Sequence, residues 1–147
     1  MERVADGESL RVLVVDDSHD IALTLEVFLR HAGYEVAVAS NGRLAVELAQ
    51  VRKPEVVLLD IDMPELDGYK VAGILRALPE TKFATIVAIT GHGTQADIEL
   101  ATESGFDMHF TKPVEFERLA TLLRAVAQHR IDRAQPQLRR QSPVGLS

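Results

Sequence analysis

Polar residues occupy four positions in the sequence where buried strands would end or have just ended. They are the acidic pair Asp16-Asp17, then Asp60, Thr90 and Lys112. Carboxylates that are crowded together repel one another, and a bound divalent cation offsets that repulsion. Carboxylate oxygens suit Mg²⁺, which keeps several waters and uses one or two carboxylates together with phosphate oxygens. These residue types therefore predict a magnesium site that is open to a phosphoryl group.

A carboxylate beside such a cation can act as a nucleophile toward a phosphoryl group. Asp60 is the strongest candidate, because the four apolar residues before it would carry it to the edge of a sheet. The oxygens of the phosphoryl group then need partners, which the Lys112 ammonium and the Thr90 hydroxyl can supply. Gly91 adds an unhindered backbone N–H. The predicted chemistry is phosphorylation of Asp60 with Mg²⁺ as the cofactor.

Each of these residues also has an ordinary structural interpretation. An Asp-Asp pair after a strand often caps a helix, a threonine at a strand end needs no function, and a lysine before a proline is commonly solvated. What favours chemistry is their joint position. All four lie at or just after the ends of predicted strands, and parallel sheets bind ligands at the carboxyl ends of their strands.

Five apolar runs alternate with five helical patterns, which predicts a doubly wound α/β fold, (βα)5, with a parallel sheet. The runs that are continuously apolar should be central and the others should be edges, which gives the strand order 2-1-3-4-5. The predicted strands are Arg11–Asp16, Tyr34–Ala39, Val56–Asp60, Thr85–Thr90 and Met108–Phe110. The predicted helices follow Ser18, Asn41 and Thr94 or span Gly68–Leu78 and Glu115–Arg130.

The composition is that of one folded domain. The chain has 147 residues, 46% of them apolar, and it contains no cysteine, which excludes disulfides and thiolate chemistry. No apolar run approaches the length of a membrane span, and residues 1–9 lack the apolar centre of a signal peptide. We therefore expect a cytoplasmic protein without membrane contact.

The net charge of −6 is unevenly distributed. Residues 130–147 hold four arginines against one acid, so this segment carries +3 and the remainder carries −9. An acidic body is a poor partner for DNA, whose affinity for proteins comes largely from phosphate neutralisation. We expect no direct DNA binding. We assign residues 10–130 to the domain, 1–9 to a flexible N-terminus and 131–147 to a disordered basic tail.

Together these motifs resemble the receiver domain of two-component response regulators. The resemblance covers about residues 10–130 and implies a flavodoxin-like fold. It rests on Val14-Val15-Asp16-Asp17-Ser18, Leu58-Leu59-Asp60-Ile61-Asp62-Met63-Pro64-Glu65-Leu66-Asp67-Gly68, Ala88-Ile89-Thr90-Gly91 and Lys112-Pro113, in that order.

The resemblance implies that Asp60 receives a phosphoryl group from a phosphohistidine on a histidine kinase or a histidine phosphotransfer protein. It implies that Asp17, Asp60 and the backbone carbonyl of Asp62 bind Mg²⁺ directly, while Asp16 acts through water. Such a protein is not an enzyme toward other substrates, because it only phosphorylates and dephosphorylates itself.

The resemblance further implies that Thr90 and Lys112 bind the phosphoryl oxygens and that the bond before Pro113 is cis. Phosphorylation would draw Thr90 inward and alter a partner-binding face made by the fourth helix, the fifth strand and the fifth helix. The partner would be a downstream protein, and a homodimer is left open.

Three positions bear on switching and phosphate lifetime. Receivers usually carry Tyr or Phe three residues before the lysine, where this chain has His109. His109 either moves inward with Thr90 or is an edge-strand histidine facing solvent. Asp62 and His92 lie two residues after Asp60 and Thr90. They either flank the water that hydrolyses the acyl phosphate or are exposed loop residues.

Other classes of protein share parts of the pattern. Asp60-Ile61-Asp62 after an apolar strand also resembles the first motif of haloacid dehalogenase-like phosphohydrolases, but those enzymes place it on their first strand and their acidic pair last. A degenerate receiver that serves as a scaffold is a second alternative. The receiver domain of a hybrid histidine kinase is a third, although the initial Met1 and the irregular tail favour a free-standing regulator.

Overall fold

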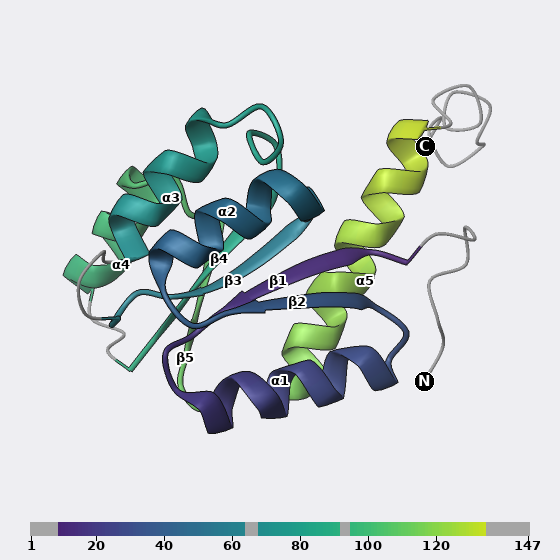
Figure 1. The fold of residues 1–147 in the computed structure, drawn as a ribbon, viewed down its shortest axis with the longest axis horizontal. Helices are drawn as coiled ribbons and strands as arrows, with labels where there is room; N and C mark the ends of the chain where they lie inside the picture. Colours follow the sequence, from purple (N-terminus) through teal and green to yellow (C-terminus); the bar gives the residue numbers. More distant parts are fainter. Residues whose placement is uncertain (1–8, 64–67, 92–94, 135–147) are drawn as a thin grey trace, which may run out of the picture.

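The structure, a computed structural model, describes residues 9–63, 68–91 and 95–134. Within these residues five parallel strands alternate with five helices in one sheet of order β2-β1-β3-β4-β5, as the sequence predicts (Figure 1). The strands are β1 Arg11–Val15, β2 Glu35–Ala39, β3 Val56–Asp60, β4 Thr85–Thr90 and β5 Met108–Thr111. The helices are α1 His19–His31, α2 Gly42–Arg52, α3 Gly68–Ala77, α4 Gln95–Glu103 and α5 Phe116–Ala134.

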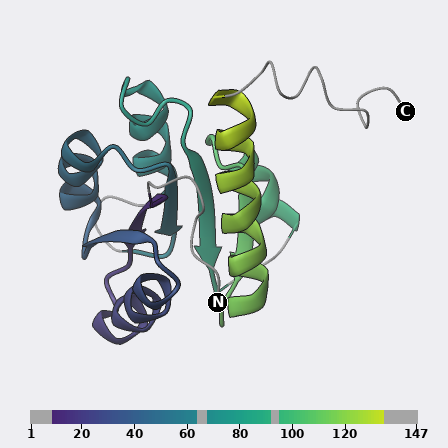
Figure 2. The same cartoon turned by 90° about the vertical axis from the view of Figure 1, so that its right-hand side faces the viewer.

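Helices cover both faces of the sheet, as Figures 1 and 2 show from two sides. Alternate residues of β1 point to opposite faces, so Val12 and Val14 pack in one core cluster while Leu13 and Val15 pack in the other. The first cluster contains buried residues of α1 and α5, and the second contains buried residues of α2, α3 and α4. Burial on both faces explains why the central strands are continuously apolar in sequence.

The strand register aligns the carboxyl ends that carry the polar residues. Val15 pairs with Leu59, Asp60 pairs with Ile89, and Thr90 pairs with Thr111. One edge of the sheet therefore holds Asp16 and Lys112, which follow β1 and β5, and Asp60 and Thr90, which end β3 and β4. This alignment fits the hydrophobic pattern, because a shift along a strand would bring the polar residue at the end of its apolar run into the core.

Caps in the sequence set where the first helices begin. The Ser18 side chain accepts a hydrogen bond from the Ile21 N–H, and the Asn41 side chain accepts one from the Leu44 N–H at 2.8 Å, which satisfies otherwise unpaired N–H groups of α1 and α2. Gly33, just past α1, has a positive φ of 98°, a conformation that glycine adopts without steric cost. The proposed capping by Thr94 lies outside the described residues.

Several boundaries differ from the prediction, most of them by one residue. Strand β1 ends at Val15 rather than Asp16, since the Asp16 side chain turns back to bond the Ser18 N–H. Helix α5 continues to Ala134, four residues past the expected end at Arg130. Arg130 contacts both carboxylate oxygens of Glu55, at 2.8 and 3.1 Å, which fastens α5 to the start of β3. No helix in the described ranges is long and apolar enough to cross a membrane.

Candidate functional site

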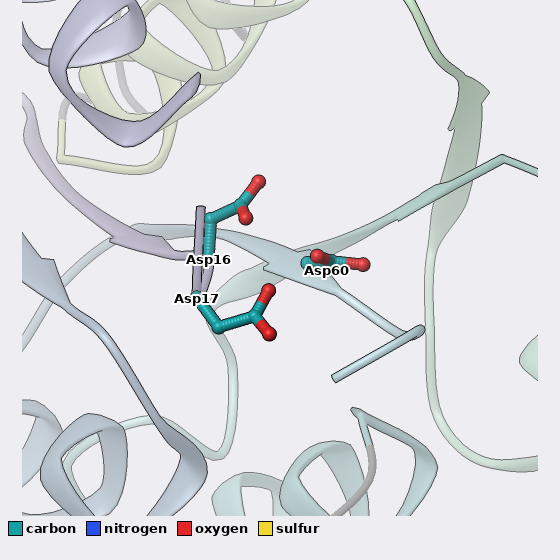
Figure 3. A group of neighbouring side chains, drawn as sticks. All are labelled: Asp16, Asp17 and Asp60. Atoms are coloured by element: carbon teal, nitrogen blue, oxygen red, sulfur yellow. The ribbon is translucent and has the colours of Figure 1, made fainter. Parts of the chain in front are cut away.

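Three carboxylates meet at the carboxyl edge of the sheet (Figure 3). Asp16 and Asp17 directly follow β1, and Asp60 is the last residue of β3, the neighbouring strand. One carboxylate oxygen of each lies within 4.8 Å of those of the other two. Asp16 is 3% exposed and Asp60 is 2% exposed, while Asp17 lies at the surface. The cluster is thus a partly buried concentration of negative charge that opens to solvent on the side of Asp17.

The buried position of Asp16 has an electrostatic cost. Burial, together with the nearby charge of Asp60, raises the pKa of Asp16 from its ordinary value of 3.8 to about 6. The Ser18 N–H, which donates to Asp16 Oδ1 at 2.8 Å, and the Lys112 ammonium both lower this pKa but do not cancel the effect. The positive groups of the protein therefore do not fully compensate the negative charge of ionised Asp16.

Both oxygens of Asp60 have partners. Its Oδ1 accepts the backbone N–H of Asp62 at 2.8 Å, and its Oδ2 accepts the Lys112 ammonium at 3.2 Å. Burial alone would lower the pKa of Lys112, but the hydrogen bond to Asp60 and the charges of Asp60, Asp16 and Asp62 raise it overall. Lys112 therefore stays cationic and holds the Asp60 side chain at the sheet edge.

Thr90 lies beside this group as the last residue of β4, and it is 3% exposed. Its carbonyl oxygen accepts the backbone N–H of Lys112 at 2.8 Å, so the ends of β4 and β5 are joined. The Lys112–Pro113 bond is cis, as the resemblance implied. Thr90 and Lys112 thus reach the edge of the sheet that holds the carboxylates, although they follow Asp60 by 30 or more residues in the sequence.

The side chain of Asp62 makes a contact that the sequence did not indicate. Its Oδ2 accepts the backbone N–H of Gly91 at 2.9 Å, while its own N–H donates to Asp60. Asp62 therefore connects the residues after β3 with the residue after β4. A signal for this contact exists only in the structure, since 29 residues separate the two partners.

The two histidines singled out from the sequence have different outcomes. His109 pairs with Ala88 across β4 and β5 and is half-buried, on the opposite face from the buried Phe110. It lies on the same face of the sheet as Thr90, two positions before Thr111, which pairs with Thr90. His92 lies outside the described residues.

A partly apolar pocket of about 450 Å³ lies next to Lys112, between α1 and the start of α5. Ile21 and Phe116, each 37% exposed, line it together with Pro113. A larger pocket of about 780 Å³ lies at the opposite end of the strands, near Arg11 and Arg130. The smaller pocket is lined by Lys112, which bonds Asp60, so of these two pockets it is the one nearer the carboxylates.

The residues present fit a magnesium ion. Hard oxygen donors suit Mg²⁺, and the clustered carboxylates supply them at a point where Asp16 lacks charge compensation. Asp17 gives the cluster a solvent-facing side, which leaves room for the waters that Mg²⁺ retains.

The comparisons with known proteins agree with this geometry. The family described as "Response regulator receiver domain" matches residues 12–124. The chain belongs to the response regulator receiver domain family. Members of this family act in two-component signalling. The acidic cluster is typical of the Mg²⁺ site of receivers. The order of strands and motifs differs from the order expected of haloacid dehalogenase-like phosphohydrolases.

Several curated proteins resemble this receiver. An uncharacterised 14.6 kDa protein of Leptolyngbya boryana is 36% identical over 104 residues, which cover 71% of this chain and 79% of that protein. The transcriptional regulatory protein PrrA of Mycobacterium tuberculosis is 35% identical over 122 residues, covering 83% of this chain and 52% of PrrA. The receiver thus spans about half the length of relatives such as PrrA.

Solved structures share the fold. The chemotaxis protein CheY4 of Vibrio cholerae has a TM-score of 0.77 at 30% identity, with 81% of this chain and 99% of that chain covered. The receiver domain of a sensor histidine kinase from Pseudomonas aeruginosa, solved with a magnesium ion coordinated in its active-site cleft, has a TM-score of 0.75 at 27% identity. That alignment covers 82% of this chain and 99% of the other.

Proposed function

We propose that this receiver is a working phosphoacceptor, in which Asp60 takes a phosphoryl group in the presence of Mg²⁺. The main support for this proposal is the environment of the Asp60 carboxylate. Its carboxylate lies among Asp16 and Asp17, and its Oδ2 is 3.2 Å from the Lys112 ammonium. A degenerate scaffold would have no need to keep this set of charges together.

Asp17 and Asp60 would bind Mg²⁺ directly, together with the backbone carbonyl of Asp62, and Asp16 would act through water. When bound, the ion would offset the negative charge of the cluster and polarise a phosphoryl oxygen. Because three carboxylates lie within 4.8 Å of one another, a phosphorylated anion would otherwise be repelled from this edge of the sheet.

The reaction would transfer one phosphoryl group from the imidazole of a phosphohistidine to Asp60. A carboxylate oxygen of Asp60 forms the new O–P bond as the P–N bond breaks, and the leaving imidazole nitrogen keeps the electron pair and takes up a proton. Lys112 and Thr90 would then bind phosphoryl oxygens. The buried Thr90 hydroxyl and the cationic Lys112 are suited to stabilising negative charge on the phosphoryl oxygens.

The donor would be a histidine kinase or a histidine phosphotransfer protein, as for receivers in general. We infer that it approaches over the pocket between α1 and the start of α5, because this pocket adjoins Lys112 and exposes Ile21 and Phe116. Apolar side chains at a rim of this kind are suited to a protein partner, whose phosphohistidine would then face Asp60.

The output would come from a population shift. A phosphoryl group on Asp60 would draw Thr90 toward it, and the shift would pass to α4, β5 and α5, where a downstream protein or a second copy would bind. His109 would act as the switch residue, because it lies on the face of β5 that Thr90 shares. Asp62 and His92 would tune the lifetime of the acyl phosphate.

Three properties expected from the sequence stay predictions: that the protein is a free-standing regulator, that it is cytoplasmic, and that the domain runs from residue 10 to residue 130. The absence of direct DNA binding is likewise a prediction, and it concerns this receiver rather than any protein that contains it.

The test is incubation with acetyl phosphate, with Mg²⁺ or with excess chelator, followed by intact mass. We expect a gain of one phosphoryl group that requires Mg²⁺ and is lost in Asp60→Asn, a variant that keeps a hydrogen-bond acceptor for Lys112. Lys112→Gln should fold and accept the group far more slowly. If the folded wild-type chain gains nothing, it is a scaffold and the proposed phosphoacceptor role is wrong.

A further inference from the structure

A closed circuit of hydrogen bonds joins the ends of three strands at the site. Asp60 Oδ1 accepts the Asp62 N–H, Asp62 Oδ2 accepts the Gly91 N–H, and the Thr90 carbonyl accepts the Lys112 N–H. The Lys112 ammonium then returns to Asp60 Oδ2. The circuit links β3, β4 and β5 while Asp60 carries no phosphoryl group.

One link in this circuit is weaker than the others. The bonds that involve Asp60 and the Thr90 carbonyl are made at buried residues. The bond from Gly91 to Asp62 is exposed, and a carboxylate side chain rather than backbone supplies its acceptor. Water can replace either partner of an exposed hydrogen bond, so this link is the one that opens at the smallest cost.

The donor in this link is also one that the phosphorylated site needs. Gly91 directly follows Thr90, so its N–H lies beside the position where phosphoryl oxygens would be bound, and oxyanions are stabilised by backbone N–H groups of this kind. A single N–H cannot fully serve both a carboxylate and a phosphoryl oxygen. In the unphosphorylated chain the carboxylate of Asp62 holds it, at 2.9 Å.

We propose that the Asp62 carboxylate competes with the phosphoryl group for the Gly91 N–H. The carboxylate holds this N–H until a phosphoryl oxygen displaces it. This inference rests on the proposed phosphoacceptor function and adds to it a positioning role for one side chain. Once its N–H is released, Gly91 is free to move toward Asp60. The Asp62 backbone N–H keeps its bond to Asp60 in both states, so only the side chain switches.

The position of Gly91 fits this exchange. A methyl group added at Gly91 would lie 3.7 Å from Asp62 Oδ2, which is ordinary van der Waals contact. The glycine is therefore not required for the bond to Asp62. It leaves the approach to this N–H open to a larger group such as phosphoryl.

Two variants of Asp62 separate the hydrogen bond from the charge. Asp62→Asn removes the negative charge but keeps a side-chain oxygen that can accept the Gly91 N–H. Asp62→Ala removes the charge and the acceptor together. Any effect of charge on an anionic phosphodonor is common to both variants, so the difference between them reports the hydrogen bond.

The first measurement needs no phosphorylation. In ¹H–¹⁵N spectra of the unphosphorylated chain, the Gly91 amide should shift and exchange with solvent faster in Asp62→Ala, and remain near its wild-type behaviour in Asp62→Asn. An unchanged Gly91 amide in Asp62→Ala would show that the link does not form in solution and would overturn the inference.

The second measurement is the initial rate of phosphorylation by acetyl phosphate with Mg²⁺. We expect Asp62→Ala to react about threefold to fivefold faster than Asp62→Asn, the effect of one solvent-exposed hydrogen bond. Equal rates would overturn the competitor role while leaving the phosphoacceptor function intact. A wild-type chain that accepts no phosphoryl group would instead refute the proposed function itself, so the two failures are distinguishable.

Discussion

Replacement of Asp16 by asparagine should stabilise the metal-free protein, and the gain should grow with pH. Asp16 is 3% exposed, and its pKa is raised to about 6 from an ordinary value of 3.8. Asparagine has nearly the same shape and keeps an oxygen for the Ser18 N–H, which bonds Asp16 Oδ1 at 2.8 Å. The substitution therefore removes the buried charge and little else.

The magnitude follows from proton linkage. Between about pH 4 and pH 6 the folded protein retains a proton on Asp16 that the unfolded chain has lost, so its stability falls as the pH rises through this window. A pKa difference of about two units corresponds to roughly 3 kcal/mol, lost in full only above about pH 7. Asp16→Asn avoids this loss. We expect the free energy of unfolding of Asp16→Asn to exceed that of the wild type by about 2–3 kcal/mol at pH 8. At pH 4.5 the difference should be only about 1 kcal/mol.

Urea unfolding at pH 4.5 and pH 8, with chelator and then with Mg²⁺, measures these differences. Mg²⁺ should stabilise the wild type at pH 8 through binding to the folded state, and it should stabilise Asp16→Asn less. Asp20→Asn, which neutralises an exposed acid in the first turn of α1, is the matched control, because it removes a carboxylate charge that is not buried. A stability difference between Asp16→Asn and wild type that is the same at both pH values would refute the reasoning.

Two further predictions concern packing and the end of α5. Gly68→Ala should lower the free energy of unfolding by about 1–3 kcal/mol, because the added Cβ would lie 2.5 Å from Ile61 Cα. Gly73→Ala, with nothing within 4 Å of its Cβ, should raise the free energy of unfolding by about 0.5–1 kcal/mol. Equal melting temperatures for the two variants would contradict this. Arg130→Gln should cost about 1–3 kcal/mol, since it removes a charged bond of 2.8 Å to the partly buried Glu55, which then keeps its longer ion pair with Arg11 at 3.5 Å. Unaltered urea unfolding would count against that role.

The sequence predicted the parts of the site that strands deliver. Asp60 and Thr90 end runs of buried apolar residues, and a shift along either strand would draw these polar residues into the core. The sheet order follows from which runs are apolar throughout, and this order brings Lys112 to Asp60. Hence the acidic cluster and its lysine could be inferred before any coordinates.

Contacts between loops could not be inferred in the same way. The bond from Gly91 to Asp62 depends on how two irregular segments approach each other, and no periodicity reports that. Arg76 is a similar case. It donates to the carbonyls of Gly105 and Ala84 and pairs with Asp107, yet in the sequence it is only one charged residue of an amphipathic helix.

The end of α5 shows a different limit. Its inner apolar spacing weakens near Arg130, so the pattern predicts an end there. The helix continues to Ala134 because Arg130 itself is anchored by Glu55 at the start of β3. A tertiary ion pair thus extends a helix that local spacing alone would have ended.

The site draws its residues from the ends of β1, β3 and β4 and from the turn after β5, between positions 16 and 112. No contiguous stretch of chain holds the set. A nascent or partly unfolded molecule in which one of these strands has not joined the sheet lacks a carboxylate, the hydroxyl or the lysine. It would be unable to compete with native molecules for the phosphoryl donor. Under the proposed phosphoacceptor function, this long-range assembly would restrict phosphorylation to completely folded receivers.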